Sequence, residues 1–373
     1  MDTSIPDSPA DPYPAVGPNW LLWPQRSAEL ARQKVIVLGG GTSDEREVSL
    51  RSAESMAAAL GGLSEHQRTA LPASLQTVEI DATGHWVVAG RALDRNTALE
   101  QLHPDGLFFL ALHGGEGEDG RIQRMLAERG LSFTGSGAES SALCMDKARA
   151  IACAREAGLQ CAPGLRVDHD SWQRDPARVR NQALGLGLGP WFVKPNCGGS
   201  SVGVVRATDP VQLSGAIESV LATGQVALVE QEIGGLEVSV GVLGGSGTPT
   251  RGLPVCEILP SAGHFFDYHE KYDGSGATEN CPPLQTPPER ALEVQGLACT
   301  AFDALGCEGY GRVDFILPRG DGPPVFLEVN TLPGMTERSL LPLAAEAAGM
   351  DMGSLCLEIL ARALPRSSPE VAP

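Results

Sequence analysis

GYGRVDFILPRGDGPPVFLEVN, residues 309–330, is the most informative segment of the chain. Two apolar, alternating stretches flank the turn-rich PRGDGPP, a pattern that predicts a β-hairpin. If the two strands pair symmetrically about the turn, Asp314 faces Glu328. Arg312 then faces Asn330. Successive side chains in a strand alternate between faces, so all four would share one face, with directly opposed residues about 5 Å apart.

These four residues are of types that bind metal ions and phosphates. Two carboxylates and an amide oxygen suit Mg²⁺, which takes few protein ligands and completes its shell with substrate phosphates. The neighbouring Arg312 would stabilise negative charge on a phosphate or a tetrahedral intermediate. The same side chains would equally suit a ladder of salt bridges on a solvated hairpin face. This segment alone leaves both interpretations open.

A second segment, VKPNCGGSSVGV (193–204), has the composition of a phosphate-binding loop. Its glycines let backbone N–H groups approach phosphate oxygens, and Ser200 and Ser201 add hydroxyl donors. Lys194 precedes the glycines, so the segment is not a Walker loop. A plain flexible hairpin turn is the alternative interpretation.

Further segments place polar side chains at the ends of apolar strands. Glu230 and Glu237 lie in VEQEIGGLEVSV, where they would accept hydrogen bonds from an adenine amino group and from ribose hydroxyls. Glu45 lies in the Gly-rich GGGTSDEREVS and His113 in LHGGEGEDG. Solvent-facing glutamates and a hydrogen-bonded structural histidine would fit these patterns as well.

Composition limits the classes of protein to which the chain can belong. Its 373 residues suggest two or three domains. A net charge of −18 argues against nucleic acid or an anionic membrane surface as the main partner. No apolar run approaches the roughly 20 residues needed to span a bilayer. The nine cysteines are an odd number without CxxC pairs, which predicts reduced, buried thiols in a cytosolic protein.

The order of predicted elements indicates an α/β fold that becomes α+β in its central and C-terminal parts. Alternating strands and helices predict a parallel sheet in an N-terminal domain, residues 34–146, with its ligand edge at the strand ends. A central domain (147–237) and a C-terminal domain (238–373) follow. The polar stretch 260–288 is too long for an ordinary connection and predicts a lid. Residues 1–33 lack signal-peptide features and predict a disordered or loosely docked extension.

Taken together, these segments closely resemble the D-alanine–D-alanine ligases of the ATP-grasp superfamily. The resemblance runs from about Lys34 to the C-terminal helix and leaves out the N-terminal extension. The matching strings are GGGTSDEREVSL, ALHGGEGEDG, TGSG with ALCMDK, VKPNCGGSSVGV, FFDYHEKY, GRVDF and EVNTLPGMTERSLLP. Their order along the chain makes a chance match very improbable.

The resemblance implies a three-domain fold that grips ATP between the central and C-terminal domains. It implies nucleotide contacts from Lys147, Lys194, Ser200, Ser201, Glu230, Glu237 and Lys271. It implies two Mg²⁺ ions, with Mn²⁺ as a substitute, on Asp314, Glu328 and Asn330. It assigns catalytic roles to Glu45, Ser200, Tyr272, Arg312 and Gly334, and substrate binding to His113 and Ser339.

The implied reaction joins two D-alanines with release of ADP and phosphate. The first D-alanine would place its amino group near Glu45, and its carboxylate would receive the γ-phosphate. The second D-alanine would attack the resulting D-alanyl phosphate while Arg312 and the Gly334 N–H stabilise the oxyanion. The family also implies a cytoplasmic homodimer that supplies peptidoglycan synthesis, with D-alanine and ATP as small-molecule partners.

Three alternatives stay open at this point. One is a D-alanine–D-lactate or D-alanine–D-serine ligase, although Tyr272 in EKY favours D-alanine as acceptor. A second is a ligase for other amino acids on the same scaffold, and a third is a non-catalytic nucleotide-binding relative. The lid residues His269 and Asp273, Gly198 in the Gly-rich loop, and the lack of an Arg before Glu237 depart from common family patterns. A dinucleotide oxidoreductase is set aside, because the first Gly-rich turn, GGGTSDERE, does not have the GxGxxG pattern.

The resemblance docks Tyr272 of the predicted lid against Glu45 and Ser200. We therefore expect Tyr272→Phe to loosen lid closure, because the phenol hydroxyl is lost. Limited proteolysis with ATP and a phosphinate analogue should cut segment 260–288 faster in the variant than in the wild type. Equal protection of the two proteins would contradict this role.

Overall fold

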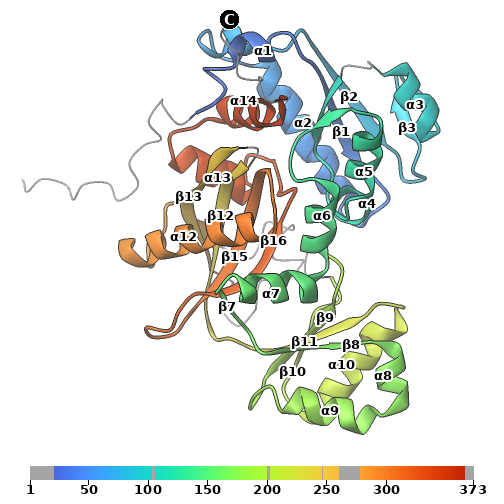
Figure 1. The fold of residues 1–373 in the computed structure, drawn as a ribbon, viewed down its shortest axis with the longest axis vertical. Coiled ribbons are helices and arrows are strands. Elements are labelled where there is room, and N and C mark those ends of the chain that lie inside the picture. Colours follow the sequence, from blue (N-terminus) through green and yellow to red (C-terminus); the bar gives the residue numbers. More distant parts are fainter. Residues whose placement is uncertain (1–20, 103–105, 200–201, 246, 260–277, 366–373) are drawn as a thin grey trace, which may run out of the picture.

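The computed structural model describes residues 21–102, 106–199, 202–245, 247–259 and 278–365. Ser200, Ser201, Lys271 and Tyr272 lie outside the described residues. The described chain forms three sheets, two of six strands and one of four. Figure 1 shows the four-stranded sheet at one end of the molecule, with the other two packed beside each other.

The N-terminal sheet has the strand order β4-β3-β2-β1-β5-β6. Its strands are β1 (Lys34–Gly40), β2 (Ser74–Ile80), β3 (Trp86–Val88), β4 (Arg91–Leu93), β5 (Gly106–Leu110) and β6 (Ser132–Phe133). The predicted parallel pairing is confirmed for β2, β1, β5 and β6, whereas β3 and β4 add an antiparallel edge. Its helices are α2 (Arg46–Gly61), η2 (Gln67–Ala70), α3 (Arg95–Gln101), α4 (Gly115–Glu118), α5 (Arg121–Glu128) and α6 (Ala138–Met145).

A close approach between β1 and α2 positions the first Gly-rich turn. A Cβ on Gly39 would lie 2.6 Å from the Cβ of Ala53, so only glycine allows α2 to pack this closely on β1. The helix begins at Arg46, and Glu45 occupies its N-cap position. The glutamate therefore stands at the carboxyl edge of the sheet, where ligands of parallel sheets bind.

The central sheet has the order β10-β9-β11-β8 and its own hydrophobic core. Its strands are β8 (Gly164–Val167), β9 (Trp191–Pro195), β10 (Val205–Ala207) and β11 (Ala227–Gln231). Helices α8 (His169–Arg174), α9 (Pro176–Leu184) and α10 (Pro210–Ala222) complete this body. Lys194, which precedes the Gly-rich loop, lies on β9.

The C-terminal sheet has the order β14-β13-β12-β15-β16-β7. Its strands are β7 (Gln160–Cys161), β12 (Gly235–Gly245), β13 (Thr248–Leu259), β14 (Thr278–Asn280), β15 (Gly309–Pro318) and β16 (Val325–Asn330). Its helices are α7 (Lys147–Glu156), α12 (Pro288–Ala304), α13 (Leu340–Ala347) and α14 (Met352–Ala363). The grouping differs from the predicted boundaries, because α7 and β7 pack against this sheet and share its core.

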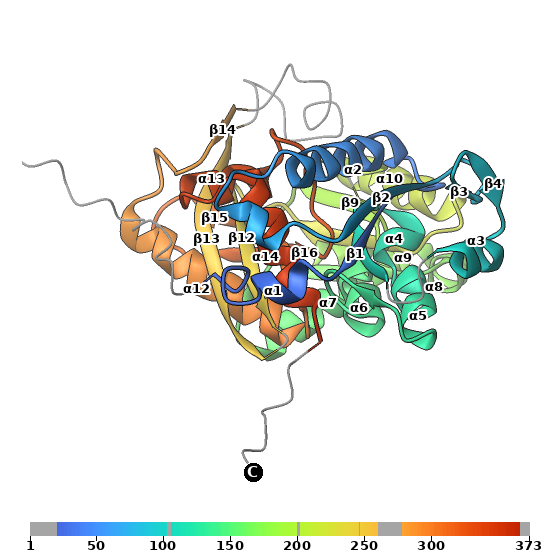
Figure 2. The ribbon, with the colours of Figure 1, turned by 90° about the horizontal axis from the view of Figure 1, so that it is seen from above.

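The two faces of the C-terminal sheet have different neighbours. Figure 2 shows α12 and α13 on opposite sides of β12 and β13. Val313 and Phe315 belong to the core on the α12 side, whereas Tyr310 belongs to the core that contains α13 and α14. By strand alternation, Arg312 and Asp314 share the face of Tyr310, toward the N-terminal sheet.

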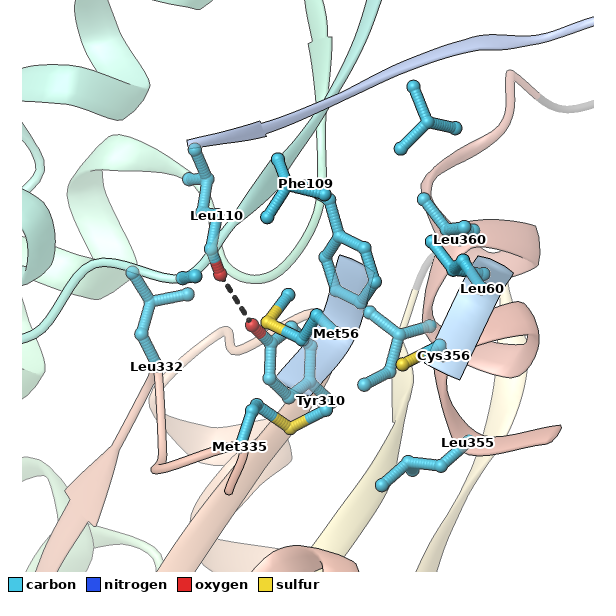
Figure 3. Packing of buried hydrophobic residues seen from close by; sticks show 14 of the residues in the cluster. Met56, Leu60, Phe109, Leu110, Tyr310, Leu332, Met335, Leu355, Cys356 and Leu360 are labelled. Atoms are coloured by element: carbon cyan, nitrogen blue, oxygen red, sulfur yellow. Dashed lines mark hydrogen bonds between the residues drawn. The ribbon is translucent and has the colours of Figure 1, made fainter. Parts of the chain in front are cut away.

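One continuous hydrophobic cluster joins the N-terminal sheet to α13 and α14. In Figure 3, Met56 of α2 and Phe109 of β5 lie beside Tyr310, with Leu355 and Cys356 of α14 nearby. The Tyr310 hydroxyl donates a hydrogen bond to the Leu110 carbonyl oxygen, 3.2 Å away. These two parts of the chain therefore share one core.

The N-terminal extension is docked over residues 21–33, contrary to the predicted loose attachment. It includes the short helix α1 (Ser27–Leu30), and the side chains of Trp23 and Leu30 are buried. The Glu358 carboxylate accepts hydrogen bonds from the Leu22 and Trp23 N–H groups, at 2.7 and 3.1 Å. Two backbone donors and the apolar side chains therefore fix this segment on α14.

The described helices and the cysteines bear on two of the predictions made from composition. Across the described ranges, no single helix has the length and apolar character to cross a membrane, and α13 with α14 passes that test only as a pair bent by 104°. The nine cysteines are free thiols, as predicted. Cys197 is exposed, however, which differs from the predicted burial of the thiols.

We expect Glu358→Ala to lower the melting temperature by several degrees. The change leaves Arg362, whose guanidinium lies 2.8 Å from the carboxylate, as a buried charge without this partner. Breaking a buried pair in this way costs about 3–5 kcal/mol. Glu346→Ala, at an exposed position on the adjacent α13, is the control and should change stability by less than about 0.5 kcal/mol. Equal melting temperatures for the two variants in differential scanning fluorimetry would contradict the anchoring role.

Candidate active site

A large cleft lies between the N-terminal and C-terminal sheets. Its volume is about 950 Å³. Residues of α2, the 112–118 turn, the β15–β16 hairpin and the 331–340 segment line it, and Gly199 of the central domain reaches it. The predicted site residues among them are Glu45, His113, Arg312, Glu328, Asn330, Gly334 and Ser339.

The hairpin cluster forms as the sequence predicts. Asp314 is opposite Glu328 and Arg312 is opposite Asn330. The Arg312 guanidinium donates to both carboxylate oxygens of Asp314, from Nε at 3.0 Å and from Nη2 at 2.8 Å. Asn330 Nδ2 donates to the same carboxylate at 2.9 Å, and the Ser239 hydroxyl donates at 2.6 Å. The buried Asp314 is therefore held by four hydrogen bonds.

The symmetric register ends at a β-bulge. Beyond Asp314 the pairing shifts, and Phe315 is opposite Phe326. The two rings pack edge to face with centroids 5.9 Å apart, in the core on the α12 side. The extra residue turns Phe326 away from the face that carries Glu328, an effect typical of bulges beside active sites. The prediction did not include this shift.

Lys147 at the start of α7 contacts Glu328 through its ammonium group. Burial alone would lower the pKa of Lys147, but the charge and hydrogen bond of Glu328 raise it above its usual value. Asn196 fixes the start of the helix, because its carbonyl oxygen accepts from the Lys147 N–H at 3.0 Å and its side chain bonds Asp146 and the Ala148 N–H. The charged Lys147 thus lies between the Gly-rich loop and the hairpin cluster.

Lys194 and Glu230 form an ion pair on neighbouring strands, with N and O atoms 2.5 Å apart. Lys194 lies on β9 and Glu230 on β11, and both side chains are at least four-fifths buried. Glu237 follows on β12, the strand of the C-terminal sheet that comes directly after β11 in the chain. The residues predicted to hold adenine and ribose therefore flank the connection between the two sheets.

Two glycines let other parts of the chain approach Glu45. A Cβ on Gly114 would lie 2.4 Å from the Glu45 carboxylate, and one on Gly199 would lie 2.9 Å from it. Gly199 belongs to the central domain, whereas Glu45 and Gly114 belong to the N-terminal domain. The Gly-rich loop therefore lies against Glu45, as far as the described residues reach.

His113 and Glu118 lie at the base of the cleft. Burial lowers the pKa of His113, although the negative charge of Glu45 opposes this shift. Desolvation, reinforced by the charge of Glu45, raises the pKa of Glu118 to about 7. Glu118 accepts from the Gly114 N–H at 2.7 Å and from the Leu332 N–H at 3.4 Å. The carboxylate therefore connects the 112–118 turn to the C-terminal domain.

Gly334 and Ser339 lie close together in the lining of the same cleft. A Cβ on Gly334 would lie 2.7 Å from the Ser339 hydroxyl oxygen. This oxygen accepts from the Thr336 N–H at 3.1 Å and lies 2.8 Å from the Thr336 hydroxyl. Ser339 is also the N-cap residue of α13. The unpaired N–H groups of a helix start favour an anion such as a carboxylate.

The donor set of the hairpin fits a hard divalent cation. Asp314 and Glu328 supply carboxylate oxygens, and Asn330 directs its amide nitrogen to Asp314, which leaves its carbonyl oxygen for a ligand. No group of three His, Cys, Asp or Glu side chains in the described part of the chain is arranged to hold a metal. The third donor here is an amide, so this observation does not conflict with the predicted ligand set.

Sequence reasoning missed four residues that build the site. They are Ser52, Glu118, Asn196 and Ser239. Glu118 and Asn196 lie inside the Gly-rich strings LHGGEGEDG and VKPNCGGSSVGV, so their polar side chains were an available signal. Ser52 and Ser239 lie within a helix and a strand, and no local pattern distinguishes them from other polar residues there.

Comparison with known proteins places this site in a family. The family model described as D-ala D-ala ligase C-terminus matches residues 153–361. The chain is 38% identical to a D-alanine–D-alanine ligase of Methylacidiphilum infernorum, over 87% of this chain and 94% of the relative. It is 40% identical to one from Nitratidesulfovibrio vulgaris, over 88% of this chain and 97% of the relative.

Experimental structures agree with these relatives. The ATP complex of the Bacillus anthracis D-alanine–D-alanine ligase superimposes with a TM-score of 0.69 at 31% identity, covering 89% of this chain and 97% of that one. The Enterococcus faecalis VanG D-Ala:D-Ser ligase gives 0.74 at 28% identity, covering 89% and 100%. The chain belongs to the D-alanine–D-alanine ligase family and has its ATP-grasp fold.

Proposed function

We propose that this enzyme joins two D-alanines in an ATP-dependent reaction that passes through D-alanyl phosphate. The observation that carries the proposal is that one cleft is lined by Glu45, His113, Arg312, Glu328 and Asn330, with Asp314 bonded to Arg312 and Asn330. The relatives named D-alanine–D-alanine ligase, which cover most of the chain, support the same activity.

In the first step, a carboxylate oxygen of the first D-alanine attacks the γ-phosphorus of ATP, and ADP leaves. Glu45 would bind the ammonium group of this D-alanine, close to His113. Lys147 and Lys194 would contact the phosphates, and Glu230 and Glu237 the adenine and ribose. Ser200, Ser201 and Lys271 are further proposed nucleotide contacts, and Tyr272 a lid contact, from sequence alone. Phosphoryl transfer of this kind depends mainly on positioning and charge stabilisation.

In the second step, the neutral amine of the second D-alanine attacks the acyl carbon. The tetrahedral intermediate then expels phosphate, and the amine proton is lost. Arg312 and the Gly334 N–H would stabilise the oxyanion, while Ser339 and the start of α13 would bind the second carboxylate. The guanidinium is held in a fixed plane by its two bonds to Asp314, so little reorganisation is needed.

Asp314, Glu328 and Asn330 would hold two Mg²⁺ ions, which Mn²⁺ could replace. When bound, the ions would neutralise charge on the transferred phosphoryl group. Arg312 holds the carboxylate of Asp314 in place, and Lys147 contacts Glu328, so each carboxylate is oriented by a positively charged side chain. The protein residues thereby maintain the donor geometry.

The wider setting of the enzyme is also part of the proposal. Reduced cysteines accord with a cytoplasmic location, and an acidic chain accords with small-molecule substrates and neither nucleic acid nor membrane as partner. A homodimer and a role in peptidoglycan precursor synthesis rest on the family. The structural similarity to a D-Ala:D-Ser ligase keeps D-serine as a second candidate acceptor.

The activity is tested by ATP-dependent phosphate release with Mg²⁺, with products identified by mass spectrometry. We expect release with D-alanine, formation of D-alanyl-D-alanine, and no release with L-alanine. Competition reactions with D-lactate or D-serine should still yield mainly the D-alanine dipeptide at neutral pH. An excess of a depsipeptide or of D-alanyl-D-serine would show that the preferred second substrate is D-lactate or D-serine and not D-alanine. Measurable ATP binding without turnover for any pair would contradict the proposed activity.

We expect Asp314→Asn and Glu328→Gln each to lower kcat at least about 100-fold with the fold intact. Each change removes a negative charge that the proposed cation needs. Asp321→Asn, on the exposed turn of the same hairpin, is the control and should leave turnover unchanged. Wild-type turnover of either cluster variant at saturating Mg²⁺, with the melting temperature as a check of folding, would rule out the metal assignment.

A further inference from the structure

Two side chains that bond to each other, His113 and Ser52, each hold one end of the segment 332–335. His113 Nδ1 lies 2.9 Å from the Leu332 carbonyl oxygen. The Met335 N–H donates to the Ser52 hydroxyl oxygen at 3.2 Å, and this oxygen lies 2.9 Å from His113 Nε2. Ser52 and His113 come from the N-terminal domain. They therefore bridge the two ends of the C-terminal segment that contains Gly334.

The partners of this network fix the direction of each hydrogen bond. A carbonyl oxygen only accepts, so His113 Nδ1 carries its hydrogen. In a neutral ring Nε2 then accepts from the Ser52 hydroxyl, whose oxygen accepts from the Met335 N–H. A charged ring would present N–H groups on both sides and leave the Ser52 hydroxyl hydrogen without an acceptor in this network. Burial, which lowers the pKa of His113, favours the neutral form as well.

Burial keeps the network in one arrangement. Ser52 is fully buried and His113 is 6% exposed. The side chains of Leu332 and Met335 are also buried, and Figure 3 shows both close to Tyr310 in the core shared by the two domains. Between these fixed ends, the intervening proline and glycine line the cleft. Pro333 and Gly334 are thus held from both directions.

We propose that Ser52 and His113 are positioning residues that hold the Gly334 N–H where the tetrahedral oxyanion forms. We refer to them as the Ser52–His113 clamp. The inference rests on the proposed function and adds a residue, Ser52, that does not touch the reacting atoms. A donor stabilises an oxyanion only within about 2.7–3.1 Å, and a displacement of about 1 Å can cost as much as 100-fold in rate.

The test variant is Ser52→Ala in the full-length enzyme. We expect kcat for dipeptide formation to fall between about 10-fold and 100-fold, because the Met335 N–H and His113 Nε2 both lose their partner. The affinity for a phosphinate analogue of the tetrahedral intermediate should fall in proportion. The KM for ATP should stay within about twofold of the wild type, because the proposed nucleotide residues are not part of the clamp.

Ser49→Ala is the matched control. Ser49 lies one helical turn earlier on α2 and is also fully buried. Its hydroxyl accepts from the Gly40 N–H at 2.7 Å and donates to the Ala111 carbonyl oxygen at 2.8 Å, so its two bonds stay within the N-terminal sheet. We expect a loss of melting temperature similar to that of Ser52→Ala, but phosphinate affinity near the wild-type value.

A second variant, His113→Asn, retains a donor near the Leu332 carbonyl and removes the acceptor for Ser52. If the clamp acts as a unit, the loss of phosphinate affinity in the double variant should be smaller than the product of the two single losses. Three results would each overturn the clamp. The first is a wild-type kcat and phosphinate affinity in Ser52→Ala, and the second is an equal loss of phosphinate affinity in Ser49→Ala. The third is a loss of phosphinate affinity in the double variant that equals the product of the two single losses. Failure of the wild type itself to form dipeptide would instead overturn the proposed function and, with it, this inference.

Discussion

The core shared by the N-terminal sheet and the C-terminal sheet sets the relative position of the two parts of the active site that these sheets carry. Within it, the Tyr310 hydroxyl of β15 donates to the Leu110 carbonyl of β5. Arg312 follows two residues after Tyr310, and His113 three residues after Leu110. The packing that joins the sheets therefore also sets the distance between the two halves of the site. A cleft built between separate, loosely associated domains would lack this fixed relation.

Charge in the cleft is organised independently of the acidity of the chain. The net charge is −18, yet the proposed substrate ATP is an anion. Lys147, Lys194 and Arg312 supply partly buried positive charge at the places where we propose that phosphate or the oxyanion lies. Each of them contacts a carboxylate. These ion pairs hold long, flexible side chains in defined positions, so the local field toward the substrate is set before it binds.

Much of this arrangement could be predicted from local pattern. Alternation and a turn motif were enough to pair Asp314 with Glu328 and Arg312 with Asn330, because both signals lie within one hairpin. The bulge that turns Phe326 into the core could not be predicted, since it depends on packing against α12. The docking of residues 21–33 depends on Glu358, more than 300 positions away in sequence, and composition alone suggested disorder.

Domain boundaries and supporting polar residues show the same limit. The pattern of predicted elements changes close to the start of α7, which suggested that this helix begins the central domain. Its apolar face packs instead on the C-terminal sheet. Helix α2 carries two buried serines, Ser49 and Ser52, and the Ser49 hydroxyl bonds only within its own domain. Which of the two reaches the 332–335 segment is determined by tertiary packing, and neither composition nor periodicity contains that information.

The central claim, that the cleft activates a carboxylate by phosphoryl transfer before the amine attacks, is tested most directly with oxygen isotopes. D-alanine labelled with ¹⁸O in its carboxylate would be supplied with unlabelled ATP, and the released phosphate analysed by mass spectrometry. Transfer through D-alanyl phosphate moves one labelled oxygen from the first D-alanine into each phosphate. We expect one ¹⁸O per phosphate formed with the dipeptide; unlabelled phosphate accompanying the same amount of dipeptide would contradict the mechanism.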